Sequence, residues 1–169
     1  MDALLVMNPQ NSFLHNQGTV YMGEKAETIK VRLIDYLSGF SKPKIFFREV
    51  HALDDTFFAT DITYSVANTP DFFINESLNR YNDVCYDKTR YSAFYGTQLG
   101  AYLKQKNIKK VGLAGMETHT SILFTAEELR NRGYEVEVIE PCTAARDEYM
   151  HGYALSLMRH SLGVQITNG

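Results

Sequence analysis

Two hydroxyl residues, Thr118 and Ser121, lie at the predicted start of a helix that runs to Arg132 and is closed by Gly133. Small hydroxylated residues at a helix start satisfy backbone N–H groups that have no partner within the helix. A serine there acts as a nucleophile only if a base takes its proton during attack. The pattern predicts a capped helix start, with Thr118 as the cap, and leaves a chemical role for Ser121 open.

Glu49 and His51 alternate along a predicted extended segment, so their side chains point to the same side. A carboxylate and an imidazole in that arrangement suit either a surface hydrogen bond or a metal ion. Lys88 stands at the end of another predicted strand, where a lysine is commonly solvated. Asn8 precedes a proline after the first strand, which is commonly just a turn. Taken alone, none of these residues establishes a site.

The two cysteines, Cys85 and Cys142, show neither structural-zinc spacing nor the pattern of a disulfide framework. Nothing in the sequence demands a bond between them. Cys142 lies at a predicted strand end, where a small buried thiol needs no function.

Composition and charge exclude several classes of function. The chain has 169 residues, 44% of them hydrophobic and 22% charged, with a net charge of −3, which suits one globular domain. Lys and Arg are scattered, so no basic stripe for nucleic acid is expected. The apolar opening at residues 3–7 is too short to span a bilayer and lacks the pattern of a signal peptide. We therefore expect a cytoplasmic protein with no membrane partner.

Apolar, β-rich runs alternate with segments of helical period, which is typical of an α/β protein. We expect one domain, residues 1–169, with three layers: a doubly wound, mainly parallel six-stranded sheet and helices on both faces. The predicted strands cover residues 3–7, 44–49, 83–87, 110–114, 136–140 and 164–167, and the predicted helices cover residues 29–40, 96–105, 118–132 and 146–160. The segment 50–81 shows no clean period. Long irregular segments in compact domains tend to be functional, so we expect substrate or metal groups there.

Three segments, in chain order, resemble signatures of the isochorismatase-like (cysteine hydrolase) superfamily, which includes nicotinamidases and isochorismatases. Residues 3–13, ALLVMNPQNSF, resemble the first strand and its D-x-Q-N-D-F signature. Residues 88–97, KTRYSAFYGT, resemble K-x-R-Y-S-A-F-x-G-T, and residues 115–126, GMETHTSILFTA, resemble G-x-x-T-x-x-C-V-x-x-T-A. The resemblance spans nearly the whole chain and implies the isochorismatase-like fold.

This resemblance places the catalytic positions at Asn8, Lys88 and Ser121, where the family has aspartate, lysine and cysteine. In the family the aspartate is the general base toward the thiol, and the lysine favours the thiolate. An amide accepts no proton near neutral pH, and a serine hydroxyl stays protonated. We therefore expect the ancestral chemistry to be weakened or lost unless another base, such as Glu117 or His119, replaces the aspartate.

The resemblance also implies an oxyanion hole formed by the backbone N–H groups of Glu117 and Ser121, the former after a cis peptide from Met116. Such donors are worth about 3 to 4 kcal/mol of barrier. The side chains expected to line the substrate pocket are Phe13, Phe58, Tyr91 and His119.

A metal site is a further implication. Nicotinamidases place a metal near a D-x-H motif and a later histidine, and Glu49, His51 and Asp55 fall at the corresponding positions. Two carboxylates and an imidazole suit zinc, manganese or iron, and the second carboxylate favours the harder ions. We expect no cofactor to be required. These residues have two alternative roles: they bind a divalent metal, or they make a simple hydrogen bond.

Three hypotheses for function follow. The first is a family hydrolase that acts on small amides such as nicotinamide, or that descends from such enzymes. The second is a non-catalytic small-molecule-binding or scaffold protein. The third is an isochorismatase-type ether hydrolase, which needs a nearby acid in place of the aspartate. In each case we expect a small-molecule ligand and a homo-oligomer.

Overall fold

One parallel sheet of six strands forms the centre of the molecule. The computed structural model describes residues 1–56 and 62–168. The strands are β1 (Ala3–Met7), β2 (Lys44–Glu49), β3 (Val84–Lys88), β4 (Lys110–Met116), β5 (Glu135–Ala144) and β6 (Gln165–Thr167). Their order is β3-β2-β1-β4-β5-β6, and every pairing is parallel. The predicted doubly wound α/β sheet is confirmed.

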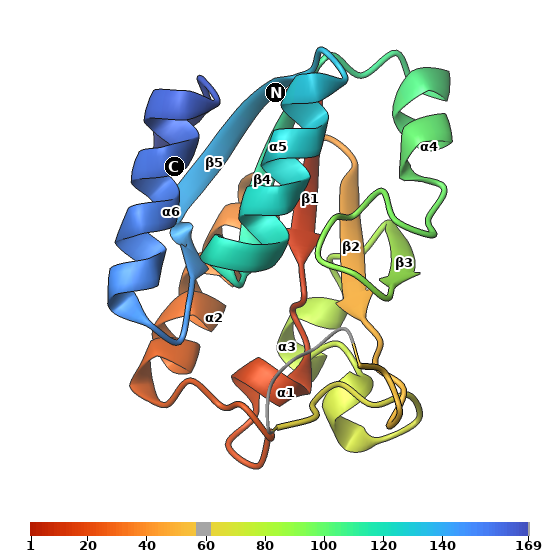
Figure 1. The fold of residues 1–169 in the computed structure, drawn as a ribbon, viewed down its shortest axis with the longest axis vertical. Coiled ribbons are helices and arrows are strands. Elements are labelled where there is room, and N and C mark those ends of the chain that lie inside the picture. Colours follow the sequence, from red (N-terminus) through yellow and green to blue (C-terminus); the bar gives the residue numbers. More distant parts are fainter. Residues whose placement is uncertain (57–61, 169) are drawn as a thin grey trace.

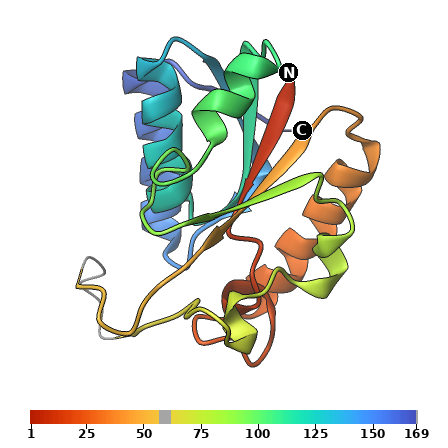
Figure 2. The same cartoon turned by 90° about the vertical axis from the view of Figure 1, so that its right-hand side faces the viewer.

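Helices cover both faces of this sheet. They are α1 (Asn11–Leu14), α2 (Glu24–Gly39), α3 (Glu76–Asn79), α4 (Leu99–Gln105), α5 (Leu123–Asn131) and α6 (Glu148–Ser161). Figures 1 and 2 show α4, α5 and α6 on one face and α2, with the short α1 and α3, on the other. This gives the three predicted layers.

The direction of winding reverses at β1. Strand β1 pairs with β2 on one side and with β4 on the other, so the chain builds one half of the sheet outward from β1 and then returns to build the second half. In sheets of this kind, ligands bind beyond the carboxyl ends of the strands at the reversal point. The residues that follow β1 and β4 therefore occupy the position where a site is expected.

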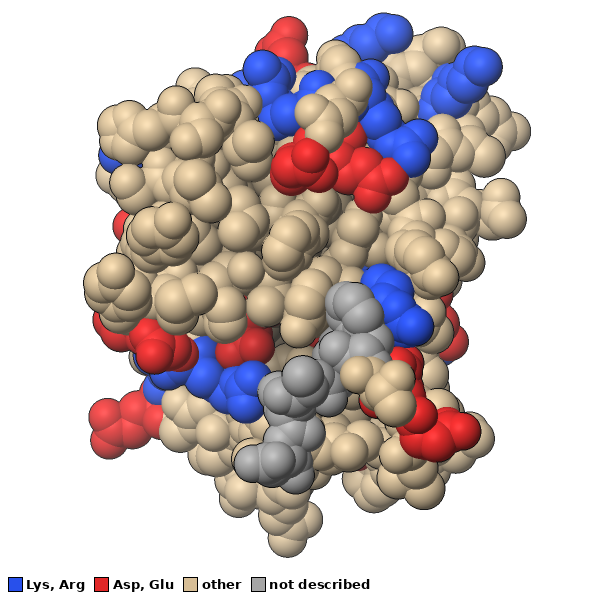
Figure 3. Space-filling view, in the orientation of Figure 1, with Lys and Arg blue, Asp and Glu red and all other residues tan. Residues whose placement is uncertain are grey.

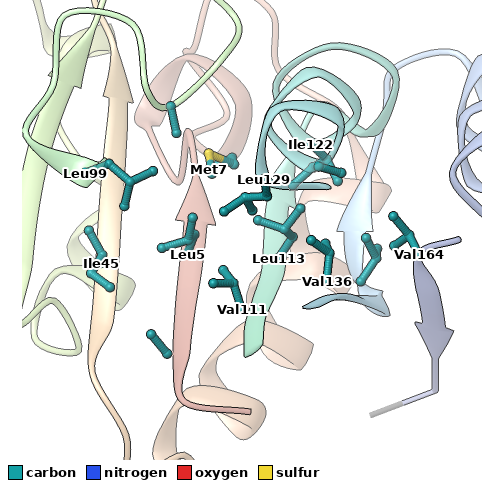
Figure 4. Packing of buried hydrophobic residues seen from close by; sticks show 14 of the residues in the cluster. Leu5, Met7, Ile45, Leu99, Val111, Leu113, Ile122, Leu129, Val136 and Val164 are labelled. Atoms are coloured by element: carbon teal, nitrogen blue, oxygen red, sulfur yellow. The ribbon is translucent and has the colours of Figure 1, made fainter. Parts of the chain in front are cut away.

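Two separate hydrophobic clusters hold the layers together. Residues of β1 alternate between them: Leu5 lies in the cluster on the α5 face, whereas Leu4 and Val6 lie in the cluster on the α2 face. Figure 4 shows the first cluster, in which strand residues such as Leu113 meet Ile122 and Leu129 on the segment that leads into and through α5. Each fully buried aliphatic side chain contributes about 1.5 to 3 kcal/mol. The helix that follows β4 is thus fixed firmly against the sheet.

The start of the α5 segment differs from the prediction. Residues Thr118–Ile122 form a single π-helical turn before α5, and the residue before that turn, Glu117, makes no side-chain cap. The Thr118 hydroxyl instead lies 2.8 Å from the ring Nδ1 of His151 in α6. The prediction that Thr118 caps the helix was wrong because a tertiary contact holds its side chain.

Two backbone features allow the ends of β1 and β4 to lie close together. Gly115 has φ +104°, and a Cβ there would lie only 2.1 Å from the carbonyl oxygen of Met7. Asn8, the next residue along from Met7, has φ +48°. Positive φ is costly for most side chains, but asparagine and aspartate tolerate it better than other residues with a Cβ. The two strand ends can therefore approach closely.

Charged side chains gather near two ends of the molecule in the view of Figure 3, where both signs are interspersed around a broad uncharged band. This face shows no basic stripe of the kind that nucleic acid requires. Among the described residues, no helix combines the length and the apolar character needed to cross a membrane.

Candidate functional site

Four polar side chains meet beyond the carboxyl ends of the strands. Asn8 follows β1, Glu49 ends β2, Lys88 ends β3, and Ser121 lies in the π-helical turn after β4. None of the four residues is more than 1% exposed. The structure thus brings Asn8, Lys88 and Ser121 together as predicted, and it adds Glu49 to them.

The amide of Asn8 bridges a carboxylate and a hydroxyl. Its Nδ2 donates to Glu49 Oε2 at 2.9 Å and to Ser121 Oγ at 3.0 Å. These two contacts use both hydrogens of the amide nitrogen. Asn8 therefore positions Ser121 and Glu49 but has no capacity to act as a base.

Lys88 is buried and not solvated, contrary to the usual state of a lysine at a strand end. Its Nζ lies 3.0 Å from Ser121 Oγ, 3.1 Å from the carbonyl oxygen of Arg90 and 3.5 Å from Glu49 Oε1. Burial lowers the pKa of the Lys88 ammonium, and the Glu49 carboxylate opposes part of that shift. A lysine with a lowered pKa can lose its proton more readily and so can accept one from a neighbouring hydroxyl.

Ser121 is held by the local backbone as well as by its neighbours. The carbonyl oxygen of Glu117 accepts hydrogen bonds from the backbone N–H groups of Thr120 and Ile122, which closes the turn around Ser121. The Met116–Glu117 peptide bond is cis. Single π-helical turns are often found at functional sites, and this one lies directly before α5.

Glu49 was expected to bind a metal, but its carboxylate lies against Asn8 and Lys88. Burial by itself would raise the pKa of Glu49, yet the neighbouring Lys88 and His51 hold it below the ordinary value. Sequence reasoning missed this role. The available signal was the sheet register, because Glu49 and Lys88 are direct neighbours at the ends of adjacent parallel strands.

The three residues predicted to hold a metal do not form a metal centre. His51 Nε2 is 3.8 Å from Glu49 Oε1, but Asp55 lies apart and makes an ion pair with Arg90 at 2.9 Å. In the described residues no three His, Cys, Asp or Glu side chains are grouped so that they could hold a metal ion. The Asp55 carboxylate is paired with Arg90, and the Glu49 carboxylate contacts Asn8 and Lys88, so the three residues do not converge on one position for a metal.

The two alternative bases suggested by the sequence are not placed to serve Ser121. The Glu117 carboxylate accepts hydrogen bonds from Arg146, at 2.9 Å from Nε, 3.2 Å from Nη2 and 3.1 Å from the backbone nitrogen. His119 lies half-buried in the same turn, and its Nδ1 makes no hydrogen bond with the residues that the structure describes. The contacts of Ser121 come from Asn8 and Lys88.

The predicted pocket residues fall into different settings. Phe13 is fully buried and packs edge-on against Tyr64 at 5.4 Å, so it belongs to the core and not to an open pocket wall. Tyr91 is half-buried and stacks on Phe124 at 5.6 Å. Phe58 lies outside the described residues.

A separate cleft of about 410 Å³ opens between α2, the end of β5 and the start of α6. Its charged lining includes Lys25, Arg32 and Glu148. Because its lining contains none of the four clustered side chains, this cleft is distinct from the site around Ser121.

Comparison with known proteins adds to this geometry. The family model described as Isochorismatase domain matches residues 2–168. The isochorismatase family protein PncA of Bacillus subtilis is 38% identical to the chain over 80 residues, which are 47% of this chain and 44% of that protein. The chain spans about half the length of the curated relatives it matches first.

Solved structures match over a greater length. The crystal structure of nicotinamidase/pyrazinamidase PncA from Bacillus subtilis has a TM-score of 0.89 and 26% identity, and the match covers 98% of each chain. A pyrazinamidase of Pyrococcus horikoshii, solved in complex with zinc, has a TM-score of 0.85 at 23% identity, covers 99% of this chain and 98% of its own, and shares the fold.

Proposed function

Because the chain belongs to the isochorismatase family, we propose that it is a hydrolase of small amides in which Ser121 takes the place of the family's cysteine nucleophile. The observation behind this proposal is the position of Ser121 Oγ, 3.0 Å from both Lys88 Nζ and Asn8 Nδ2. The solved relative called a nicotinamidase/pyrazinamidase supports small aromatic amides as the substrate class.

Lys88 is the base in this proposal. As Ser121 Oγ bonds to the amide carbonyl carbon, its proton moves to Lys88 Nζ and the carbonyl π electrons move onto the carbonyl oxygen. Collapse of this intermediate breaks the C–N bond, and the leaving nitrogen takes the proton from Lys88. Water then gives a proton to Lys88 and bonds to the acyl carbon, and that proton returns to Ser121 as the acid leaves.

Negative charge develops on the carbonyl oxygen during both steps. We assign its stabilisation to the backbone N–H groups of Glu117 and Ser121, which the family resemblance implies as an oxyanion hole. The Arg146 contacts hold the Glu117 side chain and thereby the backbone before the π-helical turn. This arrangement supplies pre-oriented donors at the start of a helix, where the helix dipole also favours negative charge.

No step of this mechanism uses a metal, because Glu49, His51 and Asp55 do not fit one. A cytoplasmic location and a homo-oligomeric state stay predictions of the sequence.

Turnover measurements on wild type and Ser121→Ala test the proposal. We expect wild type to release ammonia from at least one of nicotinamide, pyrazinamide and benzamide, and Ser121→Ala to lose turnover by about 10³-fold or more because the nucleophile is gone. Ser156→Ala, an exposed serine in α6, is the matched control and should keep the wild-type rate. Equal rates in wild type and Ser121→Ala would overturn the proposal.

A covalent trap tests the nucleophile without knowledge of the natural substrate. Incubation with p-nitrophenyl acetate should acetylate Ser121, which peptide mass spectrometry would locate, and Ser121→Ala should show no adduct there. Saturable binding of nicotinamide without ammonia release, equal in both proteins, would instead support the non-catalytic binding hypothesis.

A further inference from the structure

We propose that Glu49 supplies the acid that this site lacks at position 8, and that it does so as a positioning residue acting through Lys88 and Asn8. The proposal rests on the proposed function, since it assigns a role in the same reaction. Glu49, which the resemblance assigns to a metal, would then help to position and activate Ser121.

Each oxygen of the Glu49 carboxylate contacts one of the two residues that hold Ser121. Oε2 accepts from Asn8 Nδ2 at 2.9 Å, and Oε1 lies 3.5 Å from Lys88 Nζ. Asn8 and Lys88 in turn each lie 3.0 Å from Ser121 Oγ. One carboxylate therefore fixes both neighbours of the reactive oxygen, and all four side chains are buried.

The hydrogen-bond donors around Ser121 direct its hydroxyl proton toward Lys88. A neutral Lys88 amine has two N–H groups and one lone pair. One N–H group donates to the Arg90 carbonyl at 3.1 Å, and the Glu49 carboxylate lies 3.5 Å away on another side, which leaves the lone pair to accept the hydroxyl hydrogen of Ser121. Asn8 uses its two hydrogens for Glu49 and for the Ser121 oxygen. The hydrogen bonds to Arg90, Glu49 Oε2 and Ser121 then fix both Lys88 and Asn8 around the reactive oxygen.

The same geometry explains how the carboxylate would assist the reaction. When Ser121 passes its proton to Lys88, an ammonium forms within ion-pair distance of Glu49. A fixed opposite charge in a buried site stabilises the cation as it develops, as the aspartate does for the histidine in serine protease triads. The amide at position 8 suits this role, because a carboxylate there would face Glu49 with no hydrogen between them.

The assignment also accounts for the poor fit of a metal. A metal ion bound by Glu49 Oε1 would compete with Lys88 Nζ for that oxygen. Asp55, the second carboxylate of the predicted metal set, forms an ion pair with Arg90, which also disfavours a metal bound by this set.

A double-mutant cycle exchanges the carboxylate and the amide across one hydrogen bond. The proteins are wild type, Glu49→Gln, Asn8→Asp and the double variant Asn8→Asp/Glu49→Gln. We expect Glu49→Gln to lower kcat by about 10²-fold or more with little change in KM, because the ammonium on Lys88 loses its counter-charge. Asn8→Asp should also lose activity, since two carboxylates would meet in a buried site.

The double variant is the decisive protein, because it restores one carboxylate and one amide at the same contact with their places exchanged. We expect it to exceed the kcat of both single variants by about tenfold or more. Glu137→Gln, which breaks the 2.8 Å ion pair with Lys110 in the same sheet away from the site, is the matched control and should keep wild-type kcat.

Two results would overturn the assignment: a Glu49→Gln variant whose kcat stays within about twofold of wild type, or a double variant no better than the single ones. Failure of the proposed function is distinguishable, because wild type itself would then show no turnover that depends on Ser121. In that case the midpoints of thermal unfolding are compared. A double variant more stable than Asn8→Asp would still support the shared contact, whereas additive shifts would overturn it.

Discussion

Lys88 shows how burial changes what a single side chain can do. In water its ammonium would be protonated throughout the physiological range and could not take a proton from a serine. The desolvated position beside Ser121 lowers the pKa of Lys88 and makes the neutral amine accessible. The same side chain is therefore inert as a base in one setting and able to act in the other.

The activity should depend on pH through this group. Protonated Lys88 cannot accept the Ser121 proton, so kcat/KM should be low at acidic pH and rise as Lys88 loses its proton. Because burial lowers the pKa of Lys88, the rise should occur below the ordinary lysine value of 10.5. A series of kcat/KM measurements from about pH 5 to pH 10 checks this expectation.

Lys88→Arg is the matched variant, since a guanidinium keeps the positive charge but does not lose its proton in this range. It should lose the rising limb together with most of the activity. A flat or falling pH profile in wild type, or an active Lys88→Arg protein, would contradict the assignment of Lys88 as the base.

The family resemblance indicated three of the four site residues and assigned the fourth, Glu49, to a metal. The motifs around Asn8, Lys88 and Ser121 placed these residues together, and the structure agrees to within hydrogen-bond distance. The role of Glu49 depends on which way a carboxylate turns at the end of a strand. That direction is set by long-range neighbours, which a local pattern does not contain.

Among the elements, the first two strands were the most predictable. Strands β1 and β2 have the predicted bounds, because each contains an unbroken apolar run, residues 3–7 and 45–47, next to polar residues. Strand β5 extends beyond the predicted residue 140, through Pro141, to Ala144. Its pairing with β4 shifts register in this region, and such irregularities tolerate a proline that lacks an N–H group. Sequence patterns do not reveal the shift.

The contact between the ends of β1 and β4 should be sensitive to one methyl group. Gly115→Ala would place a Cβ against the Met7 carbonyl and force an alanine into a positive φ. We expect a loss of about 1 to 3 kcal/mol or more in the free energy of unfolding, and a fall in turnover as Asn8 and Ser121 move apart. Urea unfolding and kcat together measure both effects.

Gly152→Ala is the control for this change. Gly152 lies inside α6, and a Cβ there would meet nothing within 4 Å. Replacing glycine by alanine within a helix should stabilise the protein by about 0.5 to 1 kcal/mol. Equal effects of the two substitutions would show that the strand contact does not constrain the site.

For the molecule as a whole, the sheet separates two hydrophobic clusters, and both cysteines belong to the same side. Cys142 is buried in the cluster on the α2 face, and Cys85 packs against that cluster. Both are free thiols in the structure. Burial raises the pKa of Cys85 to about 11 and that of Cys142 to about 12, so both should be poor nucleophiles at neutral pH.

These thiols should therefore report on global unfolding. At neutral pH we expect slow reaction of the native protein with a disulfide reagent such as Ellman's reagent, and rapid reaction of two thiols in urea. The midpoint for thiol exposure should coincide with the midpoint measured by circular dichroism. Rapid labelling of Cys142 in the native state would show instead that the α2 layer opens independently of the rest.

The left-handed backbone at Asn8 constrains how this site could have changed during evolution. Few residues occupy that conformation with little strain, and aspartate and asparagine are among them. Exchange between the two alters the charge at position 8 while leaving the path of the chain intact. With a glutamate at position 49, an aspartate at position 8 would place two carboxylates in contact, so an Asp-to-Asn replacement would remove that repulsion and leave one carboxylate beside Lys88.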